Sequence, residues 1–308
     1  MSTPALRTTA ANETAPSGPG PLSAAADWAL LALPGLIWGA SFLFIAEGLE
    51  ALAPDGVTFV RIAIGFATLS LIPAARKPIQ RRDWPGTALL GVLWLAFPLS
   101  MFPHAEQRVS SAITGMLNGA TPLFAAAVAS LIAHQLPSRA ISIGLVVGIV
   151  GTALMALPTM GEGQSSLTGV LLILAAIVSY GVAINLARPL QQRNGALPVV
   201  WRALGVALIL TAPLGAPALA DAHWTLRAAL CMLALGALGT AVANVLVTIA
   251  AGRLGAARAS ATAFLIPAVA LALGVLVRGE RVALLSVIGG AVCLIGAWLI
   301  RRASLRAS

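Results

Sequence analysis

Charged and catalytic side chains are scarce in this chain. Of its 308 residues, 9% are charged, ten are Asp or Glu, and His, Cys and Tyr number three, two and one. None of the ten carboxylates falls at the centre of an apolar segment, where a proton relay through a membrane would need one. The histidines are expected in loops, and no HExxH, GxSxG or Cys-pair pattern occurs. Catalysis therefore has no candidate residues, and we expect no enzyme, no cofactor and no metal site.

The apolar content places most of the chain in lipid. It is 59% hydrophobic, with a mean hydropathy of +0.94, far from a soluble protein, in which about a quarter of residues are charged. A transmembrane helix needs about 20 mostly apolar residues. Ten such segments predict an all-α integral membrane protein, at about 28–47, 57–74, 84–103, 110–132, 139–158, 167–187, 197–217, 227–250, 257–277 and 282–300.

The basic residues indicate orientation in the membrane rather than nucleic-acid binding, although the net charge is +9. With a cytoplasmic N-terminus, the segments inside the cell carry 13 Lys or Arg and those outside carry 4, and two of the 19 lie within spans (13 + 4 + 2 = 19). Cytoplasmic loops are enriched in basic residues. Both termini are therefore predicted to be cytoplasmic, and no nucleic-acid partner is expected.

The second half of the chain matches the first after a shift of 145 residues. The shift pairs Pro122 with Pro267 and Gly144 with Gly289. Each unit holds five spans, an odd number, so the two units are predicted to be inverted. Inverted repeats are common in secondary transporters, whose substrate site lies between the halves. The expected divisions are a disordered cytoplasmic tail (1–27), a first repeat (28–158), a linker (159–166), a second repeat (167–302) and a short cytoplasmic tail (303–308).

Two stripes of neutral polar residues occur at helical spacing. Thr114, Asn118 and Thr121 fall at i, i+4 and i+7, and Thr240 and Asn244 begin a second stripe that continues to residue 248. Polar groups facing lipid are costly, so both stripes should face protein or water. They are interpreted either as hydrogen bonds between helices or as the wall of a substrate cavity.

Two aromatic residues at the middle of the membrane form a further candidate site. A shift of 142 places Trp38 on Tyr180, with Ser41 on the Trp38 face and Asn185 about one and a half turns beyond Tyr180. Buried rings of this kind either pack in a core or line a cavity, and each has a polar group that needs a partner.

Other features have a structural and a functional interpretation. Pro122 and Pro267 predict kinks in their spans, or hinges of a conformational cycle. Glycines at helix-packing spacing near 144 and 289 predict packing or dimerisation of the fifth and tenth spans. Arg61 and Arg202 lie near span ends, where basic side chains normally extend to the interface; binding a substrate carboxylate is the alternative.

These features together resemble the EamA-type branch of the drug/metabolite transporter superfamily. The resemblance rests on the stretch from Trp38 to Phe42, on Arg61, on the run from Ser110 to Pro122, and on the last hairpin from 267 to 296. It implies a ten-helix protein in the cytoplasmic (inner) membrane of a bacterium that carries small metabolites outward. One position departs from the pattern, because the first unit has Gln135 where the second has Glu280, which is interpreted as a loop cap.

The sequence thus predicts a secondary transporter that exports small, amino-acid-like, possibly aromatic metabolites by alternating access. Without a central carboxylate, facilitated or exchange-driven transport is expected. The expected partners are a small-molecule substrate, the lipid bilayer and possibly a second copy. A membrane enzyme acting on lipid-linked substrates and a non-transporting scaffold are the alternatives. The substrate-binding residues are predicted to be Trp38, Ser41, Thr114, Asn118, Tyr180, Asn185, Thr240 and Asn244.

Overall fold

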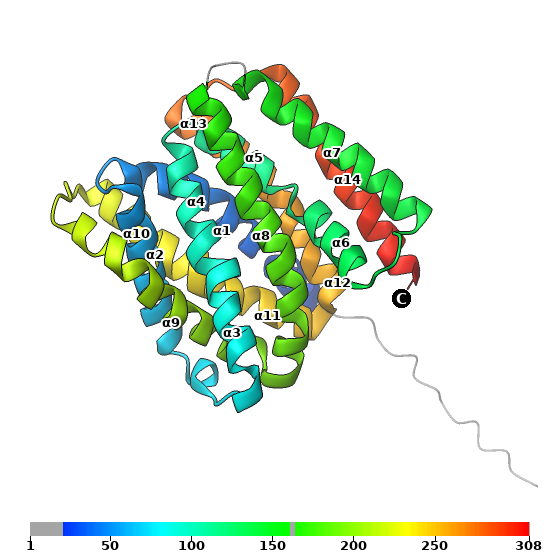
Figure 1. Cartoon of the computed structure of the whole chain (residues 1–308), viewed down its shortest axis with the longest axis horizontal. Coiled ribbons are helices and arrows are strands. Elements are labelled where there is room, and N and C mark those ends of the chain that lie inside the picture. Colours follow the sequence, from blue (N-terminus) through cyan, green and yellow to red (C-terminus); the bar gives the residue numbers. More distant parts are fainter. Residues whose placement is uncertain (1–20, 161–163, 308) are drawn as a thin grey trace, which may run out of the picture.

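The computed structural model describes residues 21–160 and 164–307, and all regular elements in this part of the chain are helical (Figure 1). The first half contains α1 (Pro21–Leu49), α2 (Pro54–Ser70), η1 (Pro73–Arg76), η2 (Arg81–Asp83), α3 (Trp84–Leu90), η3 (Gly91–Ala96), α4 (Phe97–Glu106), α5 (Ser111–Asn118), α6 (Thr121–Ile132) and α7 (Arg139–Met160). The second half contains α8 (Gln164–Asn194), α9 (Ala196–Gly215), η4 (Pro217–Leu219), α10 (Leu226–Gly236), η5 (Ala237–Val242), α11 (Ala243–Leu254), α12 (Ala256–Ala259), η6 (Ser260–Phe264), α13 (Leu265–Arg278) and α14 (Leu284–Ala307).

Helices occupy each of the ten predicted segments. Within the described ranges, nine helical stretches are long and apolar enough to cross a membrane. The remaining segment, α2, is 17 residues long, at the lower limit of a spanning helix. In lipid a backbone must satisfy its hydrogen bonds internally, which is why apolar segments of this length fold as helices.

The structure moves three expected boundaries. Residues 21–27, predicted to belong to a disordered tail, are the first turns of α1, and residues 1–20 lie outside the described part. The predicted linker loses residues 159–160 to α7 and residues 164–166 to α8, and its centre, 161–163, is not described. At the C-terminus, α14 continues to residue 307.

Equivalent helices of the two halves pack in equivalent ways. Helix α1 contacts α13, and its counterpart α8 contacts α6. Similarly, α1 packs on α11 and α8 on α4, while η3 packs on α9 and η5 on α2. Two pairs join counterparts directly: α2 with α9, and α7 with α14, which lie side by side at one edge of the molecule (Figure 1).

Glycine allows the close approach of α7 and α14. A Cβ added to Gly151 would lie 2.7 Å from the Cys293 Cα, and one added to Gly296 would lie 2.6 Å from the Gly148 Cα. Small residues of this kind let helix backbones meet in a membrane. The glycine stripe is therefore used for packing between α7 and α14 of one chain.

Interruptions in the helices also occur at matching places. The third helix of each unit contains a π-helical segment, η3 in one and η5 in the other. The fourth helix of each unit is broken, between α5 and α6 at Gly119–Ala120, and between η6 and α13 at Phe264–Leu265. π-Helical segments often occur at functional sites, so these interruptions direct attention to the helices around them.

Candidate functional site

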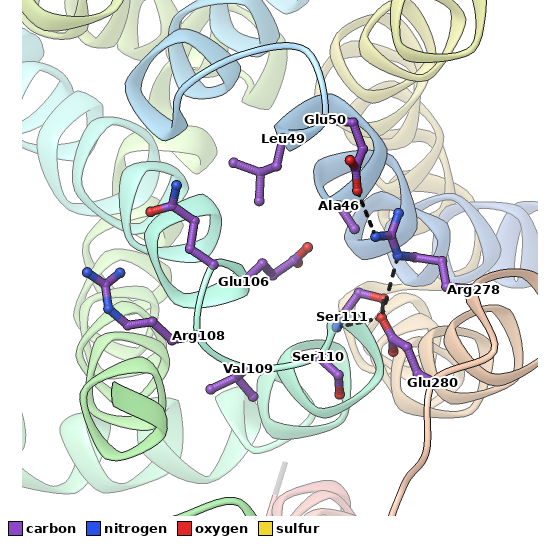
Figure 2. A pocket seen from close by; sticks show the side chains of 11 residues that line it. Ala46, Leu49, Glu50, Glu106, Arg108, Val109, Ser110, Ser111, Arg278 and Glu280 are labelled. Atoms are coloured by element: carbon purple, nitrogen blue, oxygen red, sulfur yellow. Dashed lines mark hydrogen bonds and ion pairs between the residues drawn. The ribbon is translucent and has the colours of Figure 1, made fainter. Parts of the chain in front are cut away.

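A polar cavity lies at one end of the bundle, among the C-termini of α1, α4 and α13 and the N-terminus of α5 (Figure 2). We call this the network end. The cavity has a volume of about 410 Å³, within the usual range for small-molecule sites. Its charged and polar lining residues are Glu50, Glu106, Gln107, Arg108, Ser110, Ser111, Arg278 and Glu280.

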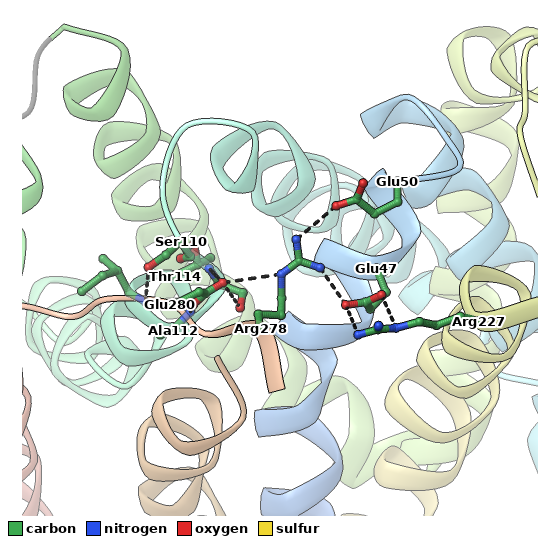
Figure 3. A network of polar contacts seen from close by, with 10 residues as sticks. Glu47, Glu50, Ser110, Ala112, Thr114, Arg227, Arg278 and Glu280 are labelled. Carbon is green, nitrogen blue, oxygen red and sulfur yellow. Dashed lines mark hydrogen bonds and ion pairs between the residues drawn. The ribbon is translucent and has the colours of Figure 1, made fainter. Parts of the chain in front are cut away.

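Arg278 is the centre of an ion-pair network beside this cavity (Figure 3). From the last turn of α13, its Nη1 donates at 2.7 Å to Oε1 of Glu47 on α1, and its Nη2 donates at 3.1 Å to Oε1 of Glu50, directly after α1. Arg227 on α10 binds the same Glu47, with Nε 2.6 Å from Oε2. The network thus connects the ends of α1, α10 and α13.

Glu280 extends the network to α5. Its Oε1 accepts hydrogen bonds from the Ser111 backbone N–H at 3.1 Å and the Ser111 hydroxyl at 2.7 Å, and its Oε2 accepts from the Ala112 N–H at 2.9 Å. The carboxylate therefore caps the first turn of α5, where the helix dipole also favours negative charge. Gly279 precedes it with φ of 67°, a left-handed conformation that ends α13 and that glycine adopts readily.

The opposite end of the bundle has separate polar contacts. Asp83, at the start of the third span, accepts from Arg193 Nη2 at 2.7 Å and from Asn194 Nδ2 at 2.7 Å, which ties α8 to η2. Asp27 on α1 pairs with Arg253 on α11, with Nε and Oδ1 separated by 2.6 Å. Both ends of the bundle therefore carry ion pairs that join different helices.

Arg61 does not extend to the membrane surface, contrary to the expectation from the sequence. It is 7% exposed, and its Nε donates to Thr240 Oγ1 on η5 at 3.1 Å. Its guanidinium lies within electrostatic range of Tyr180 and Glu106. Arg202 does follow the expected pattern, because it is half-buried and its guanidinium lies over the Trp84 and Trp201 rings, at 5.7 and 5.2 Å from their centroids.

Trp38 and Ser41 lie where α1 meets the π-helical segment η5. The Trp38 indole Nε1 donates to the Gly239 carbonyl at 3.0 Å. Ser41 is 3% exposed and donates to the Ile37 carbonyl of its own helix at 3.0 Å. These contacts satisfy the polar groups of both residues within the protein.

Tyr180 and Asn185 occupy related places on α8. The Tyr180 ring packs against Phe102 of α4, with centroids 5.9 Å apart. Asn185 Nδ2 donates to the carbonyls of Ala125 and Gly181, both at 2.9 Å, and so joins α8 to α6. Among the described residues the Tyr180 hydroxyl forms no hydrogen bond, so it is free to bind another group.

The first polar stripe does not run along one helix. Thr114 is fully buried and donates to the Ser110 carbonyl at 2.9 Å, whereas α5 ends at Asn118 and Thr121 begins α6. The stripe of Thr114, Asn118 and Thr121 therefore crosses the turn between two helices. Instead, the Thr121 hydroxyl donates back to the Asn118 carbonyl at 2.7 Å across the break.

The second stripe follows η5 into α11. Thr240 is 3% exposed, donates to the Leu235 carbonyl at 3.2 Å and accepts the Arg61 hydrogen bond. Asn244 is half-buried, and its Nδ2 donates to the Thr240 carbonyl at 2.7 Å. Of the two residues, Thr240 contacts a charged side chain on another helix.

The two matched prolines lie directly after the helix breaks. Pro122 is the second residue of α6, and Pro267 is the third residue of α13. Pro267 packs on Gly119, which lies in the other break. The breaks therefore contact each other at the centre of the bundle.

Glu106 and Glu47 are the residues that sequence reasoning missed. Glu106 lies outside the predicted span 84–103 but ends α4, and both of its carboxylate oxygens are covered without a hydrogen-bond partner among the described residues. Glu47 lies within α1 and is 5% exposed. His104, also expected in a loop, is a helical residue of α4 whose Nε2 lies 3.8 Å from Asp55 Oδ1. Their positions in the sequence were the available signal, since Glu47 and Glu106 each lie within three residues of the end of a predicted span.

The helical bundle, its apolar surface and its buried polar groups define a multi-pass membrane protein. The model of the EamA-like transporter family matches residues 28–157 and 167–302, and the chain belongs to this family. It is therefore a transporter of small molecules and not an enzyme.

Known proteins similar to the chain are consistent with this assignment. A probable terminal-alkyne amino-acid exporter of Streptantibioticus cattleyicolor is 28% identical over 285 residues, covering 91% of this chain and 94% of that protein. The uncharacterized transporter YdfC of Bacillus subtilis is 27% identical, covering 84% of this chain and 86% of the relative. One crystal structure has a TM-score of 0.59 at 19% identity, covering 92% of this chain and 99% of that one, and supports the fold.

Proposed function

We propose that this protein is a secondary transporter of the bacterial cytoplasmic membrane that exports amino-acid-like metabolites, aromatic ones included, by alternating access. It has ten transmembrane helices in two inverted five-helix repeats, with both termini cytoplasmic. Transport is facilitated or driven by exchange. The exporter relative named above supports the substrate class, and the distribution of basic residues supports the orientation.

The observation that carries the proposal is the reciprocal packing of the two units. Gly39 of α1 packs on Val269 of α13, and Gly181 of α8 packs on Phe124 of α6. These pairs are equivalent under the two sequence shifts, so the first helix of each unit crosses the broken fourth helix of the other. The predicted binding residues Trp38 and Tyr180 adjoin these two crossings, which supports a substrate site between the repeats.

The predicted residues divide into two roles. Trp38, Ser41 and Asn185 hydrogen bond within the protein and set the helix positions around the site. Thr114, Asn118, Tyr180, Thr240 and Asn244 are proposed to line a substrate site between the repeats, where polar groups and one aromatic ring suit a small, partly apolar molecule. This site is separate from the cavity at the network end, which none of these residues lines.

The ion pairs at the two ends of the bundle act as alternating closures. Under the proposed orientation, the network end faces the outside, and the contacts of Asp83 and Asp27 face the cytoplasm. Opening to the outside separates α13 and α10 from α1, which requires the Arg278 and Arg227 contacts to break. Pro122 and Pro267 are proposed as the hinges, because each follows a helix break near the centre.

Replacing the two central amides tests the function. Asn118→Leu and Asn244→Leu keep the side-chain volume and remove polar groups from the wall of the proposed substrate site between the repeats. We expect each to lower amino-acid efflux from proteoliposomes at least about tenfold, while the purified protein keeps its thermal stability. Unchanged efflux by two folded variants would contradict the proposed substrate site, whereas no efflux by folded wild-type protein would favour a scaffold.

A further inference from the structure

Two ionisable side chains of opposite type, Arg61 on α2 and Glu106 at the end of α4, lie inside this protein without forming an ion pair. Neither hydrogen bonds to the other: Arg61 Nε is bound by Thr240, and both Glu106 oxygens are covered and unpartnered among the described residues. A covered carboxylate without a partner is unusual, because its desolvation is costly unless another group compensates.

The packing of α2 on α4 directs the side chains of Arg61 and Glu106 toward each other. The Thr58 hydroxyl donates to the Leu99 carbonyl at 3.1 Å, which fixes the two helices against each other. The helices run in opposite directions, because the start of α2 lies beside the end of α4, with Asp55 3.8 Å from His104. Arg61 therefore lies about one turn deeper than the Thr58–Leu99 contact and Glu106 about two turns nearer to the network end. Because helical side chains lean toward the N-terminus of their own helix, the two side chains converge. The Tyr180 ring packs on Phe102, about one turn before Glu106.

Each charge has unused capacity for a ligand. Arg61 has five N–H donors, and its described hydrogen bonds engage only Nε. Glu106 borders the 410 Å³ cavity (Figure 2), so a ligand can reach its carboxylate from the network end after a small rotation of the side chain. The Tyr180 hydroxyl, within electrostatic range of Arg61, is also free.

We propose that Arg61 and Glu106 form a binding site for a zwitterion: the substrate's carboxylate binds Arg61 and its ammonium group binds Glu106. A ligand with one charge would leave the other protein charge unpaired, whereas a free α-amino acid satisfies both. The Phe102 and Tyr180 rings then contact the substrate side chain. This assignment rests on the proposed function and adds that both backbone charges of the substrate are required.

The test compares substrates that differ by one charge. Efflux from proteoliposomes is measured for a free aromatic amino acid, its N-acetyl derivative and its amide, with the wild type, Glu106→Gln and Arg61→Gln. We expect the wild type to prefer the free amino acid about tenfold or more, the effect of one charge-assisted hydrogen bond. Glu106→Gln should lose the preference over the N-acetyl derivative, and Arg61→Gln the preference over the amide.

Matched controls separate recognition from folding. Asp221→Asn removes an exposed carboxylate, and Arg202→Gln removes a basic residue of another span, away from Arg61 and Glu106. Both variants should keep the full wild-type preference for the free amino acid. Arg61→Lys retains the charge and should retain the preference over the amide even if overall flux falls. If Arg61→Gln does not fold, the substrate preferences of Glu106→Gln and Arg61→Lys still test the zwitterion site.

The possible outcomes distinguish failure of the proposed function from failure of the zwitterion site. If the wild type moves none of the compounds, the proposed function is wrong. If it moves the N-acetyl derivative or the amide as well as the free amino acid, or if Glu106→Gln keeps the wild-type preference, the zwitterion site is wrong and transport stands. A Glu106→Gln variant that loses only a response to an imposed pH gradient would make Glu106 a proton carrier and would also overturn this proposal.

Discussion

Replacing Arg278 should open the network end of the transporter. The side chains of Arg278 and Glu47 are 25% and 6% exposed, and their hydrogen bond is 2.7 Å long. In Arg278→Gln, Glu47 keeps its second partner, Arg227, so the variant loses one buried charge-assisted hydrogen bond, together with the exposed contact to Glu50, and leaves no buried charge alone. Such a bond contributes about 2 kcal/mol, which corresponds to about a 30-fold shift toward the open state.

The matched control is Glu50→Gln. Glu50 also binds Arg278, but its side chain is 66% exposed, and exposed pairs contribute at most about 1 kcal/mol. This variant should therefore shift the equilibrium by no more than about fivefold. The comparison isolates the buried part of the network.

Labelling of a buried cysteine measures the opening. Thr114 is fully buried just below the network, so a membrane-impermeant thiol reagent reaches Thr114→Cys from outside only in the open state. The half-buried Cys231 is replaced by Ser, and the parent without the reporter gives the background rate. Labelling should accelerate about 30-fold with Arg278→Gln. Equal rates for Arg278→Gln and Glu50→Gln would refute the closure role of the buried contact.

Two further predictions concern the scaffold. Gly151→Ala should destabilise the protein by about 1–3 kcal/mol, because the added methyl group forces α7 and α14 apart. The control Gly252→Ala, where no atom lies within 4 Å of the added methyl group, should leave the melting temperature unchanged or raise it. Equal effects of the two substitutions would contradict the role of Gly151 in helix packing. Trp38→Phe removes the hydrogen bond to η5 and should cost about 1 kcal/mol in denaturation. Trp28→Phe, at a side chain that is 72% exposed, should cost little, and a Trp38 variant as stable as this one would contradict the role of the indole.

Much of the fold could be predicted because lipid allows few alternatives. Apolar segments in a membrane must form helices, and the structure places a helix in each predicted segment. The matched prolines and glycines also identified equivalent parts of the two halves. The prolines predicted kinks in these spans, but the position of each break was not predictable, because the turn at Gly119 packs against Pro267 of the other half.

The charged part of the site was harder to predict, because burial depends on neighbouring helices. Arg61 near a span end would extend to the surface in a single helix, but Thr240, 179 residues away, provides a partner inside. Glu106 ends a helix next to a cavity formed by three other elements, so no local pattern distinguishes it from a loop residue. The polar stripes were recognisable by spacing, yet their partners were not, since each hydrogen bond is set by the packing of separate helices.

The measurement that tests the central claim most directly is counterflow in proteoliposomes. Vesicles containing the purified protein are loaded with an unlabelled aromatic amino acid and diluted into a trace of the labelled compound, without ATP and without a pH gradient. The account predicts transient accumulation of label above the level in empty vesicles, because alternating access exchanges substrate across the membrane. No accumulation by folded protein, with or without an imposed pH gradient, across amino acids and nucleosides, would contradict it.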